Sequence, residues 1–319
     1  MLSYKLQYTK DIMTHFLQSS AWKTFQEALG RQVVYDSGKG WSYQAVIESG
    51  TGNVRLYCPY GPTITSVKAF DEALTSLKKA AHDRGAAFIR VEPTTSVSPA
   101  QLRSRGLKPV TYQQLQPAHT LVIDLTASTE EILAGMSQNS RNLTRNYANK
   151  GLSIHTSSDP EDITILTSLL ASVGKRNHIQ THSLGYFKTQ AAALFPTGSA
   201  LLYYVQYEGK PIAAALVYDD ETTRYYAHAA ADDAYRKLSP GTALVGQMIL
   251  DAKVKGLASF DLYGIAPTDD PSHPWAGFTK FKRSFGGTPV SYVGTWDLPL
   301  KPIRYALYRM YQTLRRALR

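Results

Sequence analysis

Helical and extended patterns alternate along almost the whole chain. Residues 67–84 carry apolar side chains three and four positions apart and end at a glycine, and an apolar run follows at 86–91. The same order returns at 128–150, which also ends at a glycine, before the strand-like segment 152–156. Apolar residues at this spacing predict amphipathic helices, and glycine favours the left-handed backbone at a helix end. The pattern therefore predicts an α/β fold, in the broad sense that includes α+β.

The length of 319 residues fits two domains of about 150 residues, each large enough for a core of its own. The alternation starts afresh at His119, which marks the predicted start of the second domain. In the first half we expect helices at 9–29, 67–84 and 99–105, with strands at 32–35, 43–48, 55–58 and 86–91. In the second half we expect strands at 120–125, 152–156, 200–208, 211–218, 223–229 and 259–263, with helices at 128–150, 161–175, 185–194 and 241–255.

The stretch 260–298 combines glycine, aromatic and basic residues in an order that a plain core would not need. It predicts a strand end, a loop rich in Gly, Pro, Asp and Ser, a helix over 275–285, a double-glycine stop and a strand over 291–298. Phe278, Phe281 and Phe285 share one stripe of the predicted helix, and Lys282 adjoins that stripe.

The residues of this stretch resemble a known family. His-Pro-Trp, Gly-Phe, Lys-Phe-Lys and Phe-Gly-Gly follow one another in 273–287, and Tyr-Val-Gly, a second aromatic and Asp-Leu-Pro come after them. This order resembles the C-terminal signature of the FemABX aminoacyltransferases, which extend the stem peptide of peptidoglycan precursors using aminoacyl-tRNA. No charged heptad run occurs, so the chain is similar to the shorter members that lack a coiled-coil arm.

The resemblance implies a domain plan. Two tandem acyltransferase domains of the GNAT type are expected, each a mixed sheet flanked by helices. Residues 1–118 with 292–319 would form the first domain, which binds the acceptor precursor. Residues 119–291 would form the second, which contributes the catalytic lysine and the aminoacyl-tRNA channel.

The net charge indicates which classes of partner the chain can bind, and the cysteine content bears on disulfides. The net charge of +10 and the pI near 9.4 favour a polyanionic partner, such as RNA, a nucleotide diphosphate or an anionic membrane surface; solubility alone is the alternative. The single cysteine, Cys58, excludes an intrachain disulfide and is expected to be buried. Residues 1–13 lack the apolar run of a signal peptide. We therefore expect a cytoplasmic monomer, with a peripheral place at the inner membrane surface as an option, and no cofactor or metal.

Lys282 is the first candidate catalytic residue. Aminoacyl transfer passes through a tetrahedral intermediate with an oxyanion, and a fixed cation beside it can accelerate the reaction by about 10²- to 10³-fold. The resemblance assigns this role to Lys282 and places Phe281 beside it in the substrate channel. The alternative is a solvated helix lysine. No side chain is nominated as the proton acceptor.

The candidate acceptor-binding residues come mainly from the resemblance. Tyr226 fits an aromatic-x-tyrosine pattern that lines the acceptor-peptide groove, and His228 stands where the second tyrosine would be. The alternative for both is half-buried sheet surface. Tyr186 matches a residue that holds the diphosphate and sugar of the precursor, whereas His182 replaces an arginine. Neutral imidazole is a poorer diphosphate ligand than guanidinium, which favours a different acceptor, for example a lipid-linked precursor.

Two further residues are assigned to the acceptor side, and one histidine pair is considered as a metal site. Glu92 takes the place of an acidic residue that lies near the reaction centre in relatives and could orient the acceptor amine. Gln26 stands where relatives often carry a lysine in the phosphate site. His178 and His182 have the i, i+4 spacing of zinc ligands, but no Cys or acidic partner lies nearby in the sequence, so we predict no metal.

Basic residues supply the candidate tRNA contacts. Arg141, Arg145 and Lys150 fall on one predicted helix with no acid from 135 to 155, and Arg283 follows Lys282. A solvated helix face is the alternative. The tail 301–319 is a basic amphipathic helix without acidic residues, with Ile303, Leu307, Met310, Leu314 and Leu318 on one stripe, and by resemblance it returns to pack on the first domain.

Two other function classes remain open from the sequence. Residues 236–241 approximate the R-x-x-G-x-G loop that binds pyrophosphate in acetyl-CoA-dependent N-acyltransferases, with Ser239 in place of the first glycine. The basic tail also fits a non-catalytic protein that binds RNA or a membrane surface on the same fold.

Overall fold

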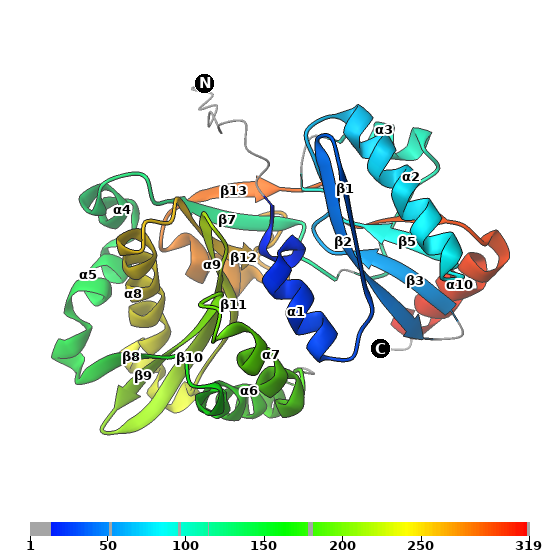
Figure 1. Ribbon diagram of the computed structural model, residues 1–319. Coiled ribbons are helices and arrows are strands. Elements are labelled where there is room, and N and C mark those ends of the chain that lie inside the picture. Colours follow the sequence, from blue (N-terminus) through cyan, green and yellow to red (C-terminus); the bar gives the residue numbers. More distant parts are fainter. Residues whose placement is uncertain (1–13, 51–52, 95–96, 114, 178–180, 318–319) are drawn as a thin grey trace. The chain divides into compact units, whose positions relative to one another are not determined.

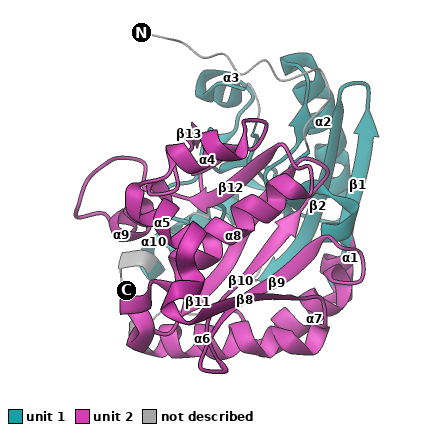
Figure 2. Cartoon of the chain, turned by 90° about the vertical axis from the view of Figure 1, so that its left-hand side faces the viewer, with its two compact units in different colours: residues 1–23, 31–116, 292–319 teal, residues 24–30, 117–291 magenta. Residues whose placement is uncertain are grey.

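The computed structural model describes residues 14–50, 53–94, 97–113, 115–177 and 181–317. The chain divides into two compact units (Figure 2). Unit 1 consists of residues 1–23, 31–116 and 292–319, and unit 2 consists of residues 24–30 and 117–291. Each unit has a sheet of its own, and the order of the elements can be followed in Figure 1.

Unit 1 contains a mixed sheet in the order β1-β2-β3-β5-β14-β6, with β4 paired to β2. The strands in the described part of the unit are β1 (Val33–Gly38), β2 (Trp41–Gly50), β3 (Asn53–Cys58), β4 (Thr63–Ile64), β5 (Phe88–Val91), β6 (Lys108–Pro109) and β14 (Trp296–Pro299). The helices are η1 (Phe16–Gln18), the start of α1 (Ser20–Ala28), α2 (Val67–Asp83), α3 (Pro99–Ser104) and α10 (Pro302–Ala317). β3 and β5 are parallel, and α2 connects them.

Alternation along β5 gives the sheet of unit 1 two apolar faces. Ile89 and Val91 are fully buried in the core that α2 covers. Phe88, which points to the other face, packs against Tyr305 and Tyr308 of α10. The predicted return of the tail helix to the first half of the chain is therefore seen.

A buried ion pair joins β14 to its neighbour β5. Arg90 donates to both carboxylate oxygens of Asp297, at 2.7 and 2.9 Å, and both side chains are fully buried. Tyr112 and Tyr305 also donate their hydroxyls to Asp297, at 2.9 and 3.1 Å. The carboxylate is thus fully hydrogen-bonded, which a buried charge requires.

Unit 2 contains a second mixed sheet, in the order β13-β7-β12-β11-β10-β9-β8. The strands in its described part are β7 (His119–Asp124), β8 (Leu152–Ser157), β9 (Ala200–Tyr207), β10 (Lys210–Asp219), β11 (Thr223–Ala231), β12 (Ser259–Gly264) and β13 (Thr288–Ser291). The helices are α4 (Thr129–Gly135), α5 (Gln138–Asn146), η2 (Tyr147–Lys150), η3 (Pro160–Asp162), α6 (Ile163–Asn177), α7 (Leu184–Leu194), η4 (Asp233–Leu238), α8 (Pro240–Val254) and α9 (Ala276–Arg283). The prediction of two mixed sheets flanked by helices is confirmed.

Each of the two sheets contains a parallel strand pair that a helix connects. In unit 2 the parallel pair is β11 and β12, and α8 connects them as α2 connects β3 and β5. Met248 and Ile249 of α8 pack with Val217, Phe260 and Leu262 of the sheet. Each such side chain contributes roughly 1.5–3 kcal/mol by its burial, so this core fixes the position of β12.

Two predicted helices are shorter than expected. Part of the predicted helix 9–29 lies outside the described residues, and the remainder is η1 followed by α1. The predicted helix 128–150 is wrong as one helix, because it is divided into α4, α5 and η2. Met136 has extended backbone with its side chain in the core, and Ser137 then caps the next helix by accepting from the Ser140 amide.

The predicted strand over 291–298 is also wrong, because two strands of different sheets share that segment. β13 pairs with β7 in unit 2, and β14 pairs with β5 and β6 in unit 1. Gly294 between them has a φ of +78°, a conformation that glycine adopts without strain. In the part of the chain that the structure describes, the helices are too short or too polar to cross a lipid bilayer.

Candidate active site

Lys282 lies in α9, the helix that follows β12 and its loop. The helix is anchored by its buried residue Thr279, whose hydroxyl accepts from the amide of Ala266 at 2.8 Å. Phe281 and Phe285 also face the core, with ring centroids 5.3 Å apart. Phe278, expected on the same stripe, is 61% exposed, because Thr279 takes the inward position beside the loop.

The Lys282 side chain is partly buried and points back to the end of β12. Its ammonium donates to the carbonyl oxygen of Gly264 at 2.6 Å. Burial lowers the pKa of Lys282 to about 8, and the neighbouring charge of Asp261 opposes that shift. The group is therefore mostly an ammonium at neutral pH, held at the edge of a low-dielectric region where a cation interacts strongly with developing negative charge.

Asp261 of β12 is buried, and its charge interacts with that of Lys282. It accepts from the Thr120 hydroxyl and from the amide of Tyr263, the latter at 2.6 Å. Burial raises the pKa of Asp261 to about 6, while these hydrogen bonds and Lys282 favour its charged form. A second carboxylate, the half-buried Asp220, accepts from Tyr225 at 2.7 Å and adds to the rise in the pKa of Asp261.

A bulge in β12 explains why the Gly264 carbonyl is placed for Lys282. Asp261 pairs with Val122 and Gly264 pairs with Thr120, so three steps along β12 match two along β7. The extra residue bends the strand end, and Tyr263 there has a φ of +60°. Positive φ in a tyrosine is a strained conformation that functional sites often contain.

An aromatic cluster, defined as Phe25, His182, Tyr186, Phe187 and His228, lies elsewhere in unit 2. The rings of His182 and Tyr186 are stacked with centroids 4.0 Å apart, and His228 lies 6.0 Å from His182 and 5.1 Å from Phe187. Burial, with a smaller contribution from His182, lowers the pKa of His228 to about 4. Its imidazole is therefore neutral at pH 7, and the cluster presents aromatic faces.

Tyr226 is not part of this cluster, although the sequence places it two residues from His228. Leu216 pairs with His228 but Val217 pairs with Tyr226, so Ala227 is an extra residue in β11. Tyr226 packs against the core that contains Val217. His228 faces the ring of Tyr218, which is on the opposite face from Val217. Tyr226 and His228 therefore lie on opposite faces of β11.

Glu92 follows β5 in unit 1 and is buried. Its two oxygens accept from the hydroxyls of Tyr57 and Thr295, both at 2.7 Å. Burial raises the pKa of Glu92, and these hydrogen bonds oppose the rise. Gln26 of α1 is also buried, next to Phe25, whose ring meets that of Tyr186 at 5.2 Å.

The candidate tRNA contacts are spread over three elements of unit 2. Arg141 and Arg145 lie on α5, but Lys150 lies in η2, so the prediction of one helix for all three is wrong. Arg145 and Lys150 are exposed. Arg283 on α9 is also exposed and pairs with Asp269.

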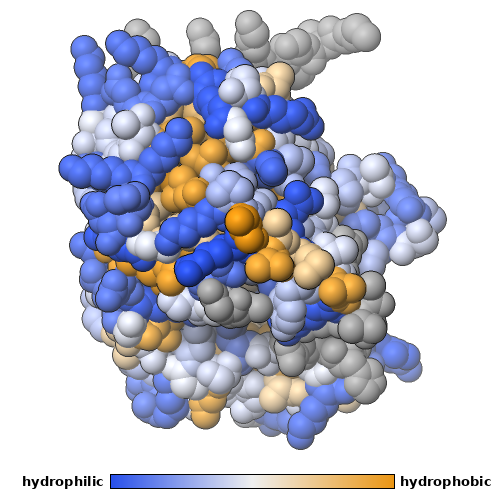
Figure 3. All heavy atoms as spheres, turned by 90° about the vertical axis from the view of Figure 1, so that its right-hand side faces the viewer, coloured by the Kyte–Doolittle hydropathy of each residue, from blue (hydrophilic) through white to orange (hydrophobic). Residues whose placement is uncertain are grey.

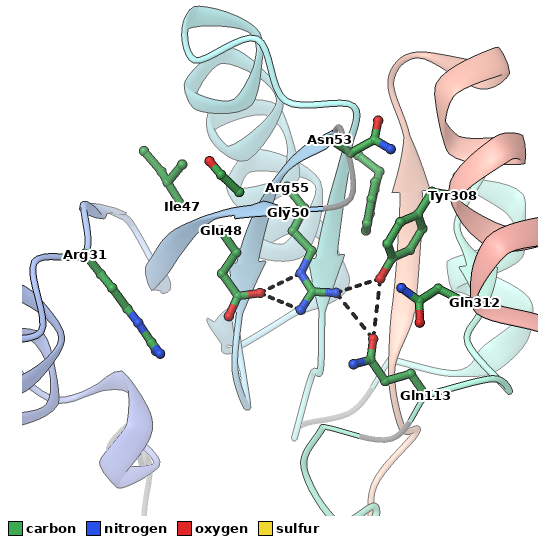
Figure 4. A pocket seen from close by; sticks show the side chains of 11 residues that line it. Arg31, Ile47, Glu48, Gly50, Asn53, Arg55, Gln113, Tyr308 and Gln312 are labelled. Atoms are coloured by element: carbon green, nitrogen blue, oxygen red, sulfur yellow. Dashed lines mark hydrogen bonds and ion pairs between the residues drawn. The ribbon is translucent and has the colours of Figure 1, made fainter. Parts of the chain in front are cut away.

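Unit 1 has a polar pocket of about 420 Å³ that no sequence pattern suggested (Figure 4). At its centre Arg55 donates to Glu48 at 2.6 Å and to the hydroxyl of Tyr308 at 3.0 Å, and Gln113 and Gln312 border it. Because Glu48 already neutralises Arg55, the pocket offers polar contacts and little net charge from this pair.

The described residues give little support to a metal site or to an acetyl-CoA-binding loop. Within the described residues no group of three His, Cys, Asp or Glu side chains could hold a metal ion, and His178 lies outside those residues. The segment 236–241 runs from the end of η4 into the first turn of α8, and so precedes a helix as the pyrophosphate loop would. However, the Ser239 amide already donates to Arg236 and Pro240 has no amide hydrogen, so fewer donors are left for a phosphate.

Comparison with known proteins decides the family. The model of the FemAB family matches residues 105–203 and 201–313, which is more than half of the chain. The chain belongs to the FemAB family. The resemblance read from 273–299 is therefore confirmed.

Individual known proteins are similar to this chain in sequence or in fold. The lipid II:glycine glycyltransferase of Staphylococcus epidermidis is 20% identical over 309 residues, covering 74% of each chain. The crystal structure of FemX superposes with a TM-score of 0.81 over 92% of this chain and 94% of that one, at 17% identity. A tandem GNAT protein from the clavulanic acid pathway shares the fold, with a TM-score of 0.51 over 83% of this chain and 81% of that one, at 13% identity. These matches confirm the tandem GNAT-like fold and support the prediction of an aminoacyl-transferring enzyme.

The main residue that sequence reasoning missed is Asp261. It stands between Phe260 and Leu262, which are both fully buried. A carboxylate inside a run that is apolar on both faces of a strand must be buried, and buried carboxylates are enriched at functional sites. That pattern could have identified Asp261, whereas Thr120 is found only through the pairing of β7 with β12.

Proposed function

We propose that this member of the FemAB family transfers an aminoacyl group from aminoacyl-tRNA to the side-chain amine of a peptidoglycan stem peptide on a lipid-linked precursor. The observation that carries the proposal is the Lys282 ammonium, which is partly buried, donates to the Gly264 carbonyl and interacts with the charge of Asp261. A solvated helix lysine would have neither the lowered pKa nor the main-chain partner. The family and the names of its characterised members support the same reaction.

The proposed chemistry uses the ammonium as an electrostatic catalyst. The acceptor amine attacks the carbonyl carbon of the aminoacyl ester, a C–N bond forms, and the carbonyl oxygen becomes an oxyanion. One N–H of Lys282 is held by Gly264, and a second can donate to that oxyanion. The C–O bond then breaks, the amide remains on the acceptor, and a proton from the amine ends on the ribose oxygen of the leaving tRNA.

Asp261 acts in this proposal as a positioning residue. Its charge raises the pKa of Lys282 against the effect of burial, and so keeps the lysine protonated at neutral pH. Phe281 excludes water from one side of the lysine by packing against the core. Neither residue needs to exchange a proton during the reaction.

The acceptor is assigned to the aromatic cluster and to unit 1. The aromatic rings of His182, Tyr186 and His228 suit apolar and sugar surfaces better than the diphosphate of a nucleotide. Glu92 in unit 1 and Gln26 in α1 are the other proposed acceptor contacts. Tyr226 packs against the core of unit 2. The lipid II substrate named for the staphylococcal relative supports a lipid-linked acceptor.

The donor is assigned to the basic residues of unit 2. Arg141, Arg145, Lys150 and Arg283 would meet phosphates of the tRNA, which adds affinity without sequence specificity. Because aminoacyl-tRNA is a cytoplasmic metabolite, the proposal includes a cytoplasmic site of action.

The decisive experiment measures transfer directly. Purified protein is incubated with radiolabelled aminoacyl-tRNA and either lipid-linked or nucleotide-linked pentapeptide, and products are separated by chromatography. Transfer to the lipid-linked acceptor is expected, and Lys282→Ala should reduce it by about 10²- to 10³-fold. Lys280→Ala, an exposed lysine on the same helix, is the matched control and should retain activity. Absence of transfer with every charged tRNA, or equal activity of Lys282→Ala, would refute the proposal.

A further inference from the structure

Helix α10 has one face that is fixed to unit 1. Tyr305 and Tyr308 are buried, and their rings meet Phe88 at 5.2 and 4.9 Å. The Tyr305 hydroxyl donates to Asp297, and the Tyr308 hydroxyl accepts from Arg55 at 3.0 Å. These contacts hold the helix in one orientation, so its other face has a defined direction.

The opposite face carries exposed apolar side chains. Ile303 is 79% exposed, and Leu307, Met310 and Leu314 are 56%, 57% and 57% exposed. At about 100° per residue these four lie within a sector of about 60°, with Tyr311 at its edge. We call these four residues the α10 stripe. Hydrophobic side chains are visible between strongly hydrophilic ones on the side of the molecule shown in Figure 3.

Basic residues border the α10 stripe. Arg304 and Arg315 are exposed and lie about 90° and about 110° from its centre on one flank, and the described residues of the chain provide no ion pair for either. The sequence from 300 to 319 contains no acidic residue. A helix with this arrangement of apolar and cationic faces is suited to the boundary between lipid headgroups and acyl chains.

We propose that α10 docks the protein on an anionic lipid surface, with the α10 stripe inserted between headgroups and the arginines at lipid phosphates. RNA phosphates would bind the arginines, but RNA would not bury the four exposed apolar side chains of the α10 stripe. A second copy of the chain would bring two acid-free basic helices together, which like-charge repulsion opposes. The lipid surface satisfies both the apolar and the cationic part of the helix.

The inference goes beyond the proposed function, because such docking needs neither tRNA nor acceptor. If both hold, a docked enzyme would meet a lipid-linked acceptor in two dimensions instead of three. The two are separable by experiment, since vesicle binding is measured without substrates and transfer can be measured on a detergent-solubilised acceptor.

The test is co-sedimentation of the purified full chain with vesicles of pure phosphatidylcholine or of phosphatidylcholine mixed with phosphatidylglycerol. Binding is expected only to the anionic vesicles, and weaker binding at higher salt. Arg304→Gln with Arg315→Gln should weaken it roughly fivefold per arginine. Leu307→Glu with Leu314→Glu should abolish it. Val254→Glu, which changes an 88% exposed valine in unit 2, is the matched control and should bind as the wild type does.

Three outcomes overturn the proposal. The first is absence of binding to the anionic vesicles at low salt, and the second is binding that survives the Leu307→Glu and Leu314→Glu changes. The third is a dimer in size-exclusion chromatography that these changes dissociate, because the α10 stripe would then be a contact between copies. Thermal unfolding of each variant verifies folding, which should be unaffected because the substituted side chains are exposed.

Discussion

The pKa of Lys282 predicts how its contribution to catalysis depends on pH. Replacing Lys282 by Met keeps a side chain of similar length and removes the charge. With a pKa of about 8, about nine-tenths of the lysines are charged at pH 7 and about one-tenth at pH 9. The advantage of the wild type over Lys282→Met, about 10²- to 10³-fold at pH 7, should therefore fall about tenfold by pH 9.

The ratio of the two rates is the quantity to measure. Deprotonation of the acceptor amine and hydrolysis of the aminoacyl ester both change with pH, but they affect the two enzymes equally and cancel in the ratio. Single-turnover transfer from radiolabelled aminoacyl-tRNA gives each rate over the range from pH 6 to pH 10. A ratio that stays constant or rises above pH 8 would show that the ammonium is not the catalytic form.

Asp261→Asn provides the companion test. Asparagine can still accept the amide hydrogen bond of Tyr263, but it no longer supplies the charge that raises the pKa of Lys282. The bend in the rate ratio should therefore move to lower pH. Asp269→Asn, which removes an exposed carboxylate paired with Arg283, should leave the bend in place.

The same lysine gives stability the opposite dependence on pH. Its folded pKa of about 8 lies below its unfolded value near 10.5, so the unfolded state binds more protons between these two pH values. Stability therefore rises with pH across this window. Relative to Lys282→Met, the wild type should gain resistance to urea from pH 8 upward while its catalytic advantage falls. A parallel change of both quantities would contradict the assigned pKa.

Two further changes test the fold that carries the site. Asp297→Ala leaves the fully buried Arg90 without its counter-charge and should lower the free energy of unfolding by about 3–5 kcal/mol, measured by urea titration. Gly287→Ala should lower it by about 2–4 kcal/mol, because φ is +92° and the new Cβ would lie 2.8 Å from the carbonyl oxygen of Val122.

Matched controls separate these mechanisms from general sensitivity. Arg105→Gln breaks an exposed ion pair with Asp71 and should change the free energy of unfolding by about 1 kcal/mol or less. Gly198→Ala also places alanine at positive φ, but nothing lies within 4 Å of its Cβ, so a loss of only about 1 kcal/mol is expected. Equal effects of Gly198→Ala and Gly287→Ala would mean that the contact with Val122 is unimportant.

Local sequence signals predicted the elements whose ends are set by their own residues. The helix expected at 67–84 is α2, and it ends before Gly85 with a φ of +65°. The helix expected at 241–255 is α8, which differs by one residue at each end. Periodicity and glycine stops are contained in the segment itself, so a single sequence is enough to place them.

Features that depend on partners far along the chain could not be predicted in this way. Only the two ends of the segment 291–298 are strands, and which sheet each end joins depends on β7, β5 and β6. The faces of Tyr226 and His228 depend on the bulge at Ala227, which only the pairing of β11 with β10 defines. A one-residue irregularity reverses the face of a side chain without any change in the local pattern.

The candidate site contains both kinds of feature: a motif that is contiguous in the sequence, and a position that strand pairing determines. Lys282 could be nominated because its motif is contiguous, but its function depends on where its ammonium is held. That position follows from the extra residue in β12, which lets Asp261 stay in the sheet beside Thr120 while the Gly264 carbonyl turns to the lysine. A regular β12 would place Gly264 one residue out of register and would relieve the positive φ of Tyr263. The bulge therefore directs the Gly264 carbonyl to the lysine, and Tyr263 takes its positive φ as part of that bulge.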